Sequence, residues 1–368
     1  PEYSDFVLVD KEGLANTALV WHGGRLLAME EGHLPHELDP VTLESIGPWN
    51  YRGKLHTAMT AHPKVDPATG EMVFFAYMAS GPFAADVAVH KVDPVGVLTE
   101  TIILATPYSA MVHDFVLTEN HIIIPVMPIS GSLERAMEGG PPFAWEPEKG
   151  VHVGILPRHG GTAEDIKWLE MDLAFAFHFM NGFDQDGVVT IDCCQMEHAP
   201  LFPTADGGST GKTEPMLSRW TIDLNQDSPR VEFECIDEFQ SEFPQCDPRY
   251  ACRPYRHGWY TSTDFGLAAD LEANDNFFNV VGHYDHETRK EDRYSCGRSL
   301  VSEALFVPKS DDAAEGEGYL LSVATNFDTH LSSLFIFDAL NISAGPVAKV
   351  HLSHRVPAGF HGFWRSNS

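Results

Sequence analysis

Short runs rich in β-branched and aromatic residues recur along the whole chain, each bounded by Asp, Asn, Pro or Gly. Such runs favour strands, and the residues that bound them favour turns. Connections such as DPATGE at residues 66–71 and DHETRKED at 285–292 are short, so neighbouring runs are expected to pair antiparallel. The clearest runs lie at residues 16–30, 71–79, 119–128, 187–194, 230–237, 276–285, 318–327 and 332–340. This pattern predicts an all-β chain built as a strand–turn–strand meander.

Helical periodicity is scarce by comparison. The two best candidates are residues 134–140 and 162–171, and neither looks like a crossover helix. Many strands at regular spacing with few helices are typical of a sandwich, a barrel or a propeller, and a chain of 368 residues fits a propeller best. No strict repeat such as a recurring Trp-Asp pair adds to this choice. Two long loops, 129–160 and 195–215, are expected to form the mouth of a binding site.

The composition restricts the class of partner. A hydrophobic content of 43% with 23 Phe is ample for a large core, and no run reaches the roughly 18 apolar residues of a membrane span. The formal charge of −29 argues against nucleic acid and against anionic membrane surfaces, because both would repel the chain. Six cysteines without a CxxC pair fit a reducing compartment. We therefore expect small neutral partners and a cytoplasmic location.

Four of the 19 histidines lie in distinctive surroundings: His62 in TAHPKVDPATGE, His113 in MVHDFVLTEN, His178 in FHFMNGFDQDG and His361 in VPAGFHGFW. Their separations are far longer than the spacings of zinc fingers or HExxH helices, so spacing alone predicts no metal site. Neutral imidazoles suit Fe, Zn, Cu or Ni. Four of them without a carboxylate ligand would leave the ion its full charge and room for dioxygen. The hypothesis requires that the four rings converge.

The surrounding motifs resemble the carotenoid cleavage oxygenase family from residue 16 to residue 364. The segments that carry the resemblance occur in the order of that family, and they are NTALVWHGGRLLAMEEG, LDPVTLESIG, TAHPKVDPATGE, MVHDFVLTEN, EFPQCDPRY, EALFVP and VPAGFHGFW. The resemblance implies a seven-bladed β-propeller with a central metal site capped by loops. It also implies that a non-haem Fe(II) is held by His62, His113, His178 and His361.

The same resemblance implies three glutamates that accept the outer N–H groups of the ligand rings. Such carboxylates fix the ring tautomer and raise the basicity of the ligand. The matching positions are Glu30, Glu242 and Glu303. The family also carries a further N-terminal segment, so we expect residues 1–368 to form a single propeller domain that lacks this segment.

The stretch HFMNGFDQDG resembles the HxMNGF pattern of lignostilbene dioxygenases, which favours an aryl-alkene substrate. In stilbene cleavers that bind a phenol, a Lys precedes the first glutamate, and the residue before Glu30 is Met29. A thioether cannot stabilise a phenolate, so a less polar or differently oriented ring is expected at Met29. Phe202 is a second candidate for contact with the substrate, because aromatic substrates stack on such rings.

Three functions stay open at this point. The first is an Fe(II)-dependent dioxygenase that uses O2 to cleave a conjugated C=C bond of a stilbenoid or phenylpropenoid into two carbonyl products. The second keeps this chemistry but takes an apocarotenoid or carotenoid. The third is a propeller that binds an apolar ligand without cleaving it. A homodimer is compatible with all three, and the sequence does not decide the oligomeric state.

Overall fold

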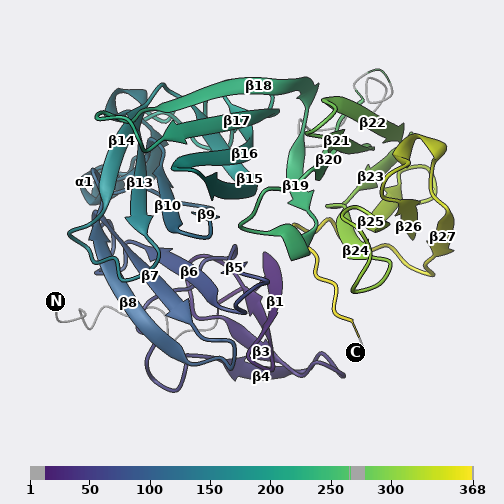
Figure 1. Cartoon of the computed structure of the whole chain (residues 1–368), viewed down its shortest axis with the longest axis horizontal. Coiled ribbons are helices and arrows are strands. Elements are labelled where there is room, and N and C mark those ends of the chain that lie inside the picture. The colour runs from purple at the N-terminus through teal and green to yellow at the C-terminus, as the bar shows by residue number, and fades with distance from the viewer. Residues whose placement is uncertain (1–12, 265, 267–277, 367–368) are drawn as a thin grey trace.

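The computed structural model describes residues 13–264, 266 and 278–366, and within them six sheets stand around a common centre (Figure 1). Each blade sheet is antiparallel throughout. The first sheet contains β1 (Ala18–His22), β2 (Arg25–Met29), β3 (His36–Leu38) and β4 (Ser45–Pro48). The second contains β5 (Lys64–Val65), β6 (Met72–Tyr77), β7 (Asp86–Val92) and β8 (Leu98–Ala105).

The remaining sheets continue the ring. The third contains β9 (Val116–Leu117), β10 (His121–Val126), β13 (Val151–Pro157) and β14 (Lys167–Met171). The fourth contains β15 (Phe175–Gln185), β16 (Val188–Met196), β17 (Met216–Asp223) and β18 (Val231–Gln240). The fifth contains β19 (Glu242–Cys246), β20 (His257–Ser262), β21 (Val280–Asp285) and β22 (Lys290–Ser295). The sixth contains β23 (Ser299–Val301), β24 (Leu305–Pro308), β25 (Gly318–Asn326), β26 (Ser332–Asp338) and β27 (Ala348–His351).

This arrangement confirms the all-β propeller. Strands that follow one another in sequence are mostly neighbours in a sheet, as the short turn-type connections predict. The outermost strands of the first five sheets are β4, β8, β14, β18 and β22 (Figure 1). The described residues contain six blade sheets, so the seven-bladed form of the propeller stays a prediction.

Apolar side chains fill the interfaces between neighbouring sheets. Ile123 of the third sheet and Trp220 of the fourth belong to one buried cluster. Trp259 of the fifth sheet stacks on Phe306 of the sixth, with ring centroids 4.5 Å apart. Because successive side chains of a strand point to opposite faces, a strand between two blades buries both faces. The core is therefore a ring of blade interfaces around a central opening.

Two local predictions need correction. A helix does form after Ser132, as α1 (Leu133–Met137) with the Ser132 side chain accepting from Arg135 N–H. The helix predicted at 162–171 is wrong, because residues 167–171 form β14 at the edge of the third sheet and pair with β13. The segment 129–160 is not one loop, because it contains the two-stranded sheet of β11 (Ile129–Gly131) and β12 (Phe143–Trp145) as well as β13.

Residues 352–366, which we call the return segment, carry the chain from β27 of the sixth sheet to β1 of the first (Figure 1). The N–H of His361 donates to Thr17 O at 3.1 Å. The Arg365 guanidinium lies over the Trp21 ring, 3.6 Å from its centroid. These contacts hold an irregular segment against the inner edge of the first sheet and thereby place His361 near the centre of the ring.

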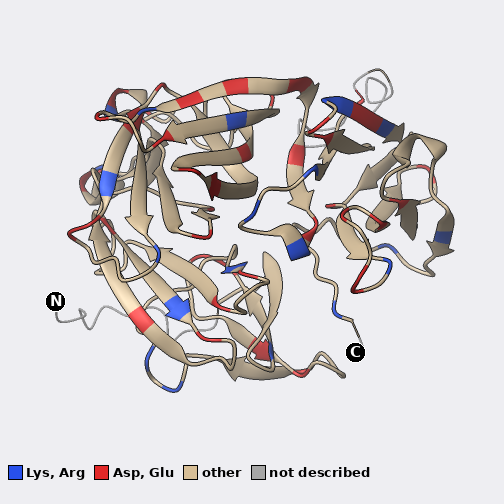
Figure 2. Ribbon diagram, viewed as in Figure 1, with Lys and Arg blue, Asp and Glu red and all other residues tan. Residues whose placement is uncertain are grey.

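Acidic residues occur on the outer strand β18 and in many connections, whereas basic residues are few (Figure 2). No helix among the described residues is long and apolar enough to span a membrane.

Candidate metal centre

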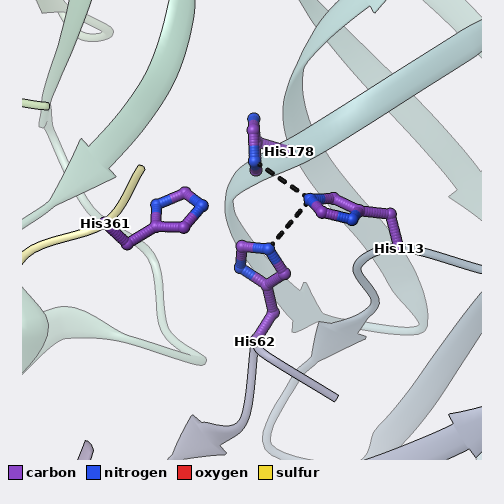
Figure 3. A group of neighbouring side chains, drawn as sticks. All are labelled: His62, His113, His178 and His361. Carbon is purple, nitrogen blue, oxygen red and sulfur yellow. Dashed lines mark hydrogen bonds between the residues drawn. The ribbon is translucent and has the colours of Figure 1, made fainter. Parts of the chain in front are cut away.

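The four predicted histidines meet at the centre of the ring (Figure 3). One nitrogen from each ring lies within 4.8 Å of the others. His62 lies two residues before β5 and His113 three residues before β9, whereas His178 lies in β15 and His361 in the return segment. Since β5, β9 and β15 are the innermost strands of their sheets, residues on them or just before them reach the axis. The required convergence is therefore present.

The Nε2 atoms face the centre. His113 Nε2 lies 3.0 Å from His62 Nε2 and 3.3 Å from His178 Nε2. The side chains of His178 and His361 are each 11% exposed. Each ring therefore presents a lone pair to one small space from which water is largely excluded.

An irregular stretch of β15 surrounds His178. The pairing of β15 with β16 shifts register between Ala176 and Phe179 and again between Phe179 and Asn181. Such bulges bend a strand and change the direction of a side chain. The buried Asn181 side chain then donates to Tyr250 O and Arg253 O and accepts from Cys252 N–H. The residues that follow His178 are thus tied to the segment after β19.

Carboxylates accept the outer N–H of three of the four rings. His178 Nδ1 donates to Glu242 Oε2 at 2.6 Å, and His361 Nδ1 donates to Glu303 Oε1 at 2.9 Å. The Glu242 and Glu303 residues are only 7% and 4% exposed. A carboxylate in this position holds the ring in the tautomer whose Nε2 lone pair points inward. The structure places both predicted glutamates where that role requires them.

The third carboxylate corrects the sequence prediction. His113 Nδ1 is hydrogen bonded to Glu31, whereas the predicted Glu30 is paired with His33. The two glutamates are adjacent and directly follow β2. Of the two, Glu31 is the one that contacts a ring of the central group.

Glu303 also holds the return segment. Its Oε2 accepts from Gly362 N–H at 2.9 Å, and its Oε1 accepts from Gln245 Nε2 at 2.6 Å in addition to His361. One carboxylate therefore fixes both the ring of His361 and the peptide that follows it. Sequence reasoning missed Gln245, although it lies three residues after Glu242 in the EFPQCDPRY motif.

Burial and the neighbouring charges set the protonation of the rings. The pKa of His62 lies well below its usual value because of burial and because of the other three histidines. Burial likewise lowers the pKa of His178. Burial is also the largest single effect on His113 and acts in the same direction, but the hydrogen bond and charge of Glu31 together with the charges of Asp114 and Glu242 outweigh it and raise the pKa of His113. Neutral rings at His62 and His178 are the state that a metal ion requires.

Two cavities adjoin the rings. The smaller one, about 60 Å³, lies against His62, His178 and His361 and is also lined by Lys64 and Asp114. The larger one, about 380 Å³, has a mainly apolar lining and also reaches His62 and His361. Its walls come from the inner strands of the sheets and from the return segment. The centre therefore has access both to a polar pocket and to an apolar chamber.

Aromatic rings next to the histidines differ from those predicted. Phe177 meets His113 edge to face, with centroids 5.5 Å apart, and Phe243 stacks on His178 at 5.2 Å. Phe243 adopts a positive φ of 50°, which is uncommon for a bulky residue and which a bulge in β19 accommodates. Phe177 directly precedes His178, and Phe243 directly follows Glu242. This adjacency to predicted site residues is the sequence signal that could have identified both rings.

Neither predicted substrate contact lines the cavities. Met29 is 1% exposed and packs in the core of the first two sheets with Leu27 and Phe74. Phe202 packs against the buried cluster between the third and fourth sheets. Both side chains therefore serve the core, and the predicted contacts of Met29 and Phe202 with substrate find no support.

Four convergent imidazole nitrogen donors with carboxylates behind three of them fit a transition-metal ion. The fold and the site together define a β-propeller metalloprotein with an all-histidine, non-haem centre.

Comparison with known proteins identifies the family within this class. The sequence model of the retinal pigment epithelial membrane protein family matches residues 3–366. The chain is 38% identical to isoeugenol monooxygenase of Pseudomonas putida, over 96% of this chain and 76% of that protein. It is 37% identical to lignostilbene-alpha,beta-dioxygenase isozyme III of Sphingomonas paucimobilis, over 97% of this chain and 75% of that protein.

Solved structures agree with these matches. The lignostilbene dioxygenase of Pseudomonas brassicacearum superposes with a TM-score of 0.92 at 34% identity, covering 96% of this chain and 75% of that one. The Synechocystis apocarotenoid oxygenase, as its Glu150Gln mutant, gives a TM-score of 0.84 at 26% identity, covering 98% and 77%. The chain belongs to the retinal pigment epithelial membrane protein family, that is, to the carotenoid cleavage oxygenases. It is an enzyme of a family of iron-dependent oxygenases that cleave alkenes, and four-histidine sites are typical of Fe(II) in that family.

Proposed function

We propose that this protein is an Fe(II)-dependent dioxygenase that cleaves the conjugated C=C bond of an aryl-alkene, a stilbenoid or phenylpropenoid, into two carbonyl products. The observation that carries the proposal is the convergence of His62, His113, His178 and His361, with Glu31, Glu242 and Glu303 behind three of the rings. Bound Fe(II) would supply the activation of O2.

The residues of this chain would bind the metal ion and orient the substrate. The four imidazoles carry no negative charge, so the ion would keep its full positive charge. The three glutamates hold the Nδ1–H groups and keep the Nε2 lone pairs inward. Phe177, Phe243 and the apolar chamber keep water away from the centre and offer surfaces on which a flat conjugated substrate can stack.

Two arguments favour an aryl-alkene. The HFMNGF stretch around His178 matches the pattern of the stilbene-cleaving branch. In addition, relatives at 37–38% identity carry the names lignostilbene dioxygenase and isoeugenol monooxygenase. An apocarotenoid or carotenoid is the second candidate, because a carotenoid 9,10-cleavage dioxygenase of Crocus sativus is 31% identical. Membership of this enzyme family counts against the third reading, a propeller that only binds an apolar ligand.

The correction from Glu30 to Glu31 changes the argument about phenols. If Glu31 is the first glutamate, the residue before it is Glu30, not Met29. A carboxylate at the position where phenol-binding stilbene cleavers carry a Lys would repel a phenolate. We therefore infer that a 4-hydroxyl group, if the substrate has one, is recognised in its neutral form or elsewhere in the chamber.

The test is product analysis with the Fe(II)-loaded protein on three probes: a stilbene, isoeugenol and an apocarotenal. We expect two carbonyl products from an aryl-alkene, and with ¹⁸O₂ one labelled oxygen in each product. Cleavage of the apocarotenal alone would reverse the choice of substrate. Full iron occupancy with no cleavage and no O2 uptake on any probe would overturn the proposal.

Four further expectations are kept as proposals. The ring is expected to have seven blades, as the family resemblance implies, and residues 1–368 are expected to form a single propeller domain. The cytoplasmic location follows from the cysteine pattern. A homodimer is the proposed oligomeric state, and measurement of the molecular size in solution tests it.

A further inference from the structure

Three of the four histidine-bearing segments meet at one carboxylate, that of Asp114. Asp114 follows His113 directly and is 2% exposed. Its Oδ1 lies 2.7 Å from the Nζ of Lys64, which comes two residues after His62. Its Oδ2 accepts from the N–H of Phe179 at 3.0 Å, and Phe179 directly follows His178. A single buried group thus touches the neighbours of three metal-facing rings from three different sheets.

The local structure explains why a carboxylate is needed there. β15 shifts register on both sides of Phe179, so the regular ladder with β16 is interrupted at this point. A buried N–H without an acceptor costs about 1–3 kcal/mol, and Asp114 supplies the acceptor. The same carboxylate neutralises the Lys64 ammonium, whose side chain is 26% exposed and lines the small cavity beside the rings. Removing Asp114 would therefore release β15 and leave a cation next to the metal centre.

We propose that Asp114 is a positioning residue that sets the mutual placement of His62, His113 and His178, with Lys64 as its counter-ion. This inference rests on the metal centre of the proposed function and not on the choice of substrate. Asp114 acts through the backbone and through Lys64, because its oxygens are engaged by those groups and not by the rings. Metal affinity and ligand-field geometry should both depend on it.

The experiment measures Co²⁺ binding without substrate or O2, using the visible absorption of the Co²⁺-loaded protein as a report of coordination geometry. We expect Asp114→Ala to weaken Co²⁺ binding about 10-fold or more and to change the absorption band, as the loss of a group that supports metal ligands usually does. Asp114→Asn keeps an acceptor for Phe179 N–H but leaves Lys64 unpaired, so its effect should be smaller. Combining Asp114→Asn with Lys64→Met removes the unpaired charge and should restore much of the affinity.

Asp184 offers a matched control in the same part of the ring. Its carboxylate lies in β15 and accepts from the backbone and side chain of Asn120, just after β9, at the far end of the same two elements. Asp184→Ala should lower thermal stability but leave Co²⁺ affinity and the absorption band unchanged. Equal losses of affinity in Asp184→Ala and Asp114→Ala would overturn the proposal, because general loosening of the ring would then explain both.

Two further outcomes also overturn it. One is an Asp114→Ala protein that is folded by circular dichroism and binds Co²⁺ with the affinity and spectrum of the wild type. If Asp114→Ala does not fold, Asp114→Asn and Lys64→Met carry the test, and wild-type affinity and spectra in both would refute the role. Failure of the aryl-alkene proposal would instead appear only in the turnover assay and would leave these binding data intact.

Discussion

At the scale of single residues, the four histidines could be found from sequence because each lies within a specific local motif. The prediction did not come from spacing, since ligands that lie far apart in sequence follow no local rule. Glu242 and Glu303 were found in the same way. Glu31 was missed because two glutamates are adjacent, and a motif cannot tell which of two neighbours faces the centre of a ring.

Removing one imidazole should empty the centre. We expect His178→Ala to lower bound iron well below one ion per chain and to abolish turnover, because the three remaining donors, which come from separate segments, hold the ion less tightly. Metal analysis of the purified variant measures this. His159→Ala is the control, since that ring is exposed and its hydrogen bond to Glu119 O lies outside the group of four. Full iron content in His178→Ala would remove this residue from the ligand set.

The adjacent glutamates provide a direct comparison. Glu31→Gln should weaken metal binding or slow turnover about 10-fold, because the amide cannot hold the Nδ1–H of His113 as a carboxylate does. Glu30→Gln should have little effect on metal binding, because Glu30 is paired with His33. Isothermal titration with Fe(II) distinguishes the two. The reverse order of effects would restore the original prediction of Glu30.

At the scale of elements, strands and hairpins were predictable because alternation and turn residues are local signals. The segment 162–171 was predicted as a helix but forms strand β14, because pairing with β13 overrides its weak helical pattern. The bulges of β15 could not be predicted, since they depend on contacts with Asp114 and with residues 250–253 that lie far away in sequence.

Asn181 should be important for stability. Its side chain satisfies three backbone groups of residues 250–253, so Asn181→Ala leaves them without partners in a buried place. We expect a loss of about 3 kcal/mol in the free energy of unfolding, measured with urea. Asn225→Ala, in an exposed turn, should change stability by less than about 1 kcal/mol. Equal losses of stability in the two variants would show that the three hydrogen bonds of Asn181 contribute no more than those of an exposed turn.

Buried histidines on β20 and β21 predict a pH dependence. Burial lowers the pKa of His283 to about 4, and its ring lies 3.0 Å from that of His257. The unfolded chain takes up a proton near pH 6.5 that the folded protein resists, so this stabilisation is complete above that pH and is lost as the pH falls towards 4.

His283→Gln should therefore show a weaker decline of melting temperature between pH 6.5 and pH 4 than the wild type. The difference reflects a free energy on the order of 3 kcal/mol for one such group. Parallel curves for the two proteins would mean that His283 titrates normally in the folded state.

At the scale of the whole molecule, the path by which the chain returns from the sixth sheet to the first was not visible in the sequence. No repeat marks the blades, and the return segment has no regular structure from which its path could be predicted. Its place follows from tertiary contacts, chiefly those of Glu303 with His361 and Gly362 and of Thr17 with His361. The resemblance to a family supplied what physical patterns in the sequence could not.

Metal removal should loosen the return segment. An ion bound by His361 and the other three histidines would stabilise the folded state by about 2.7 kcal/mol at a free concentration 100 times its Kd. Treatment with a chelator should therefore lower the melting temperature and make the return segment easier to cleave by protease, detected by mass spectrometry. Unchanged cleavage would show that Glu303 and Thr17 suffice to hold the segment.

The position of His361 also bears on biosynthesis. This ligand leaves the ribosome long after the other three, and the glutamate that holds it comes from the last of the described sheets. A nascent chain can therefore offer an incoming ion only three of its four donors. The complete set of four donors is therefore present only after translation has passed this residue.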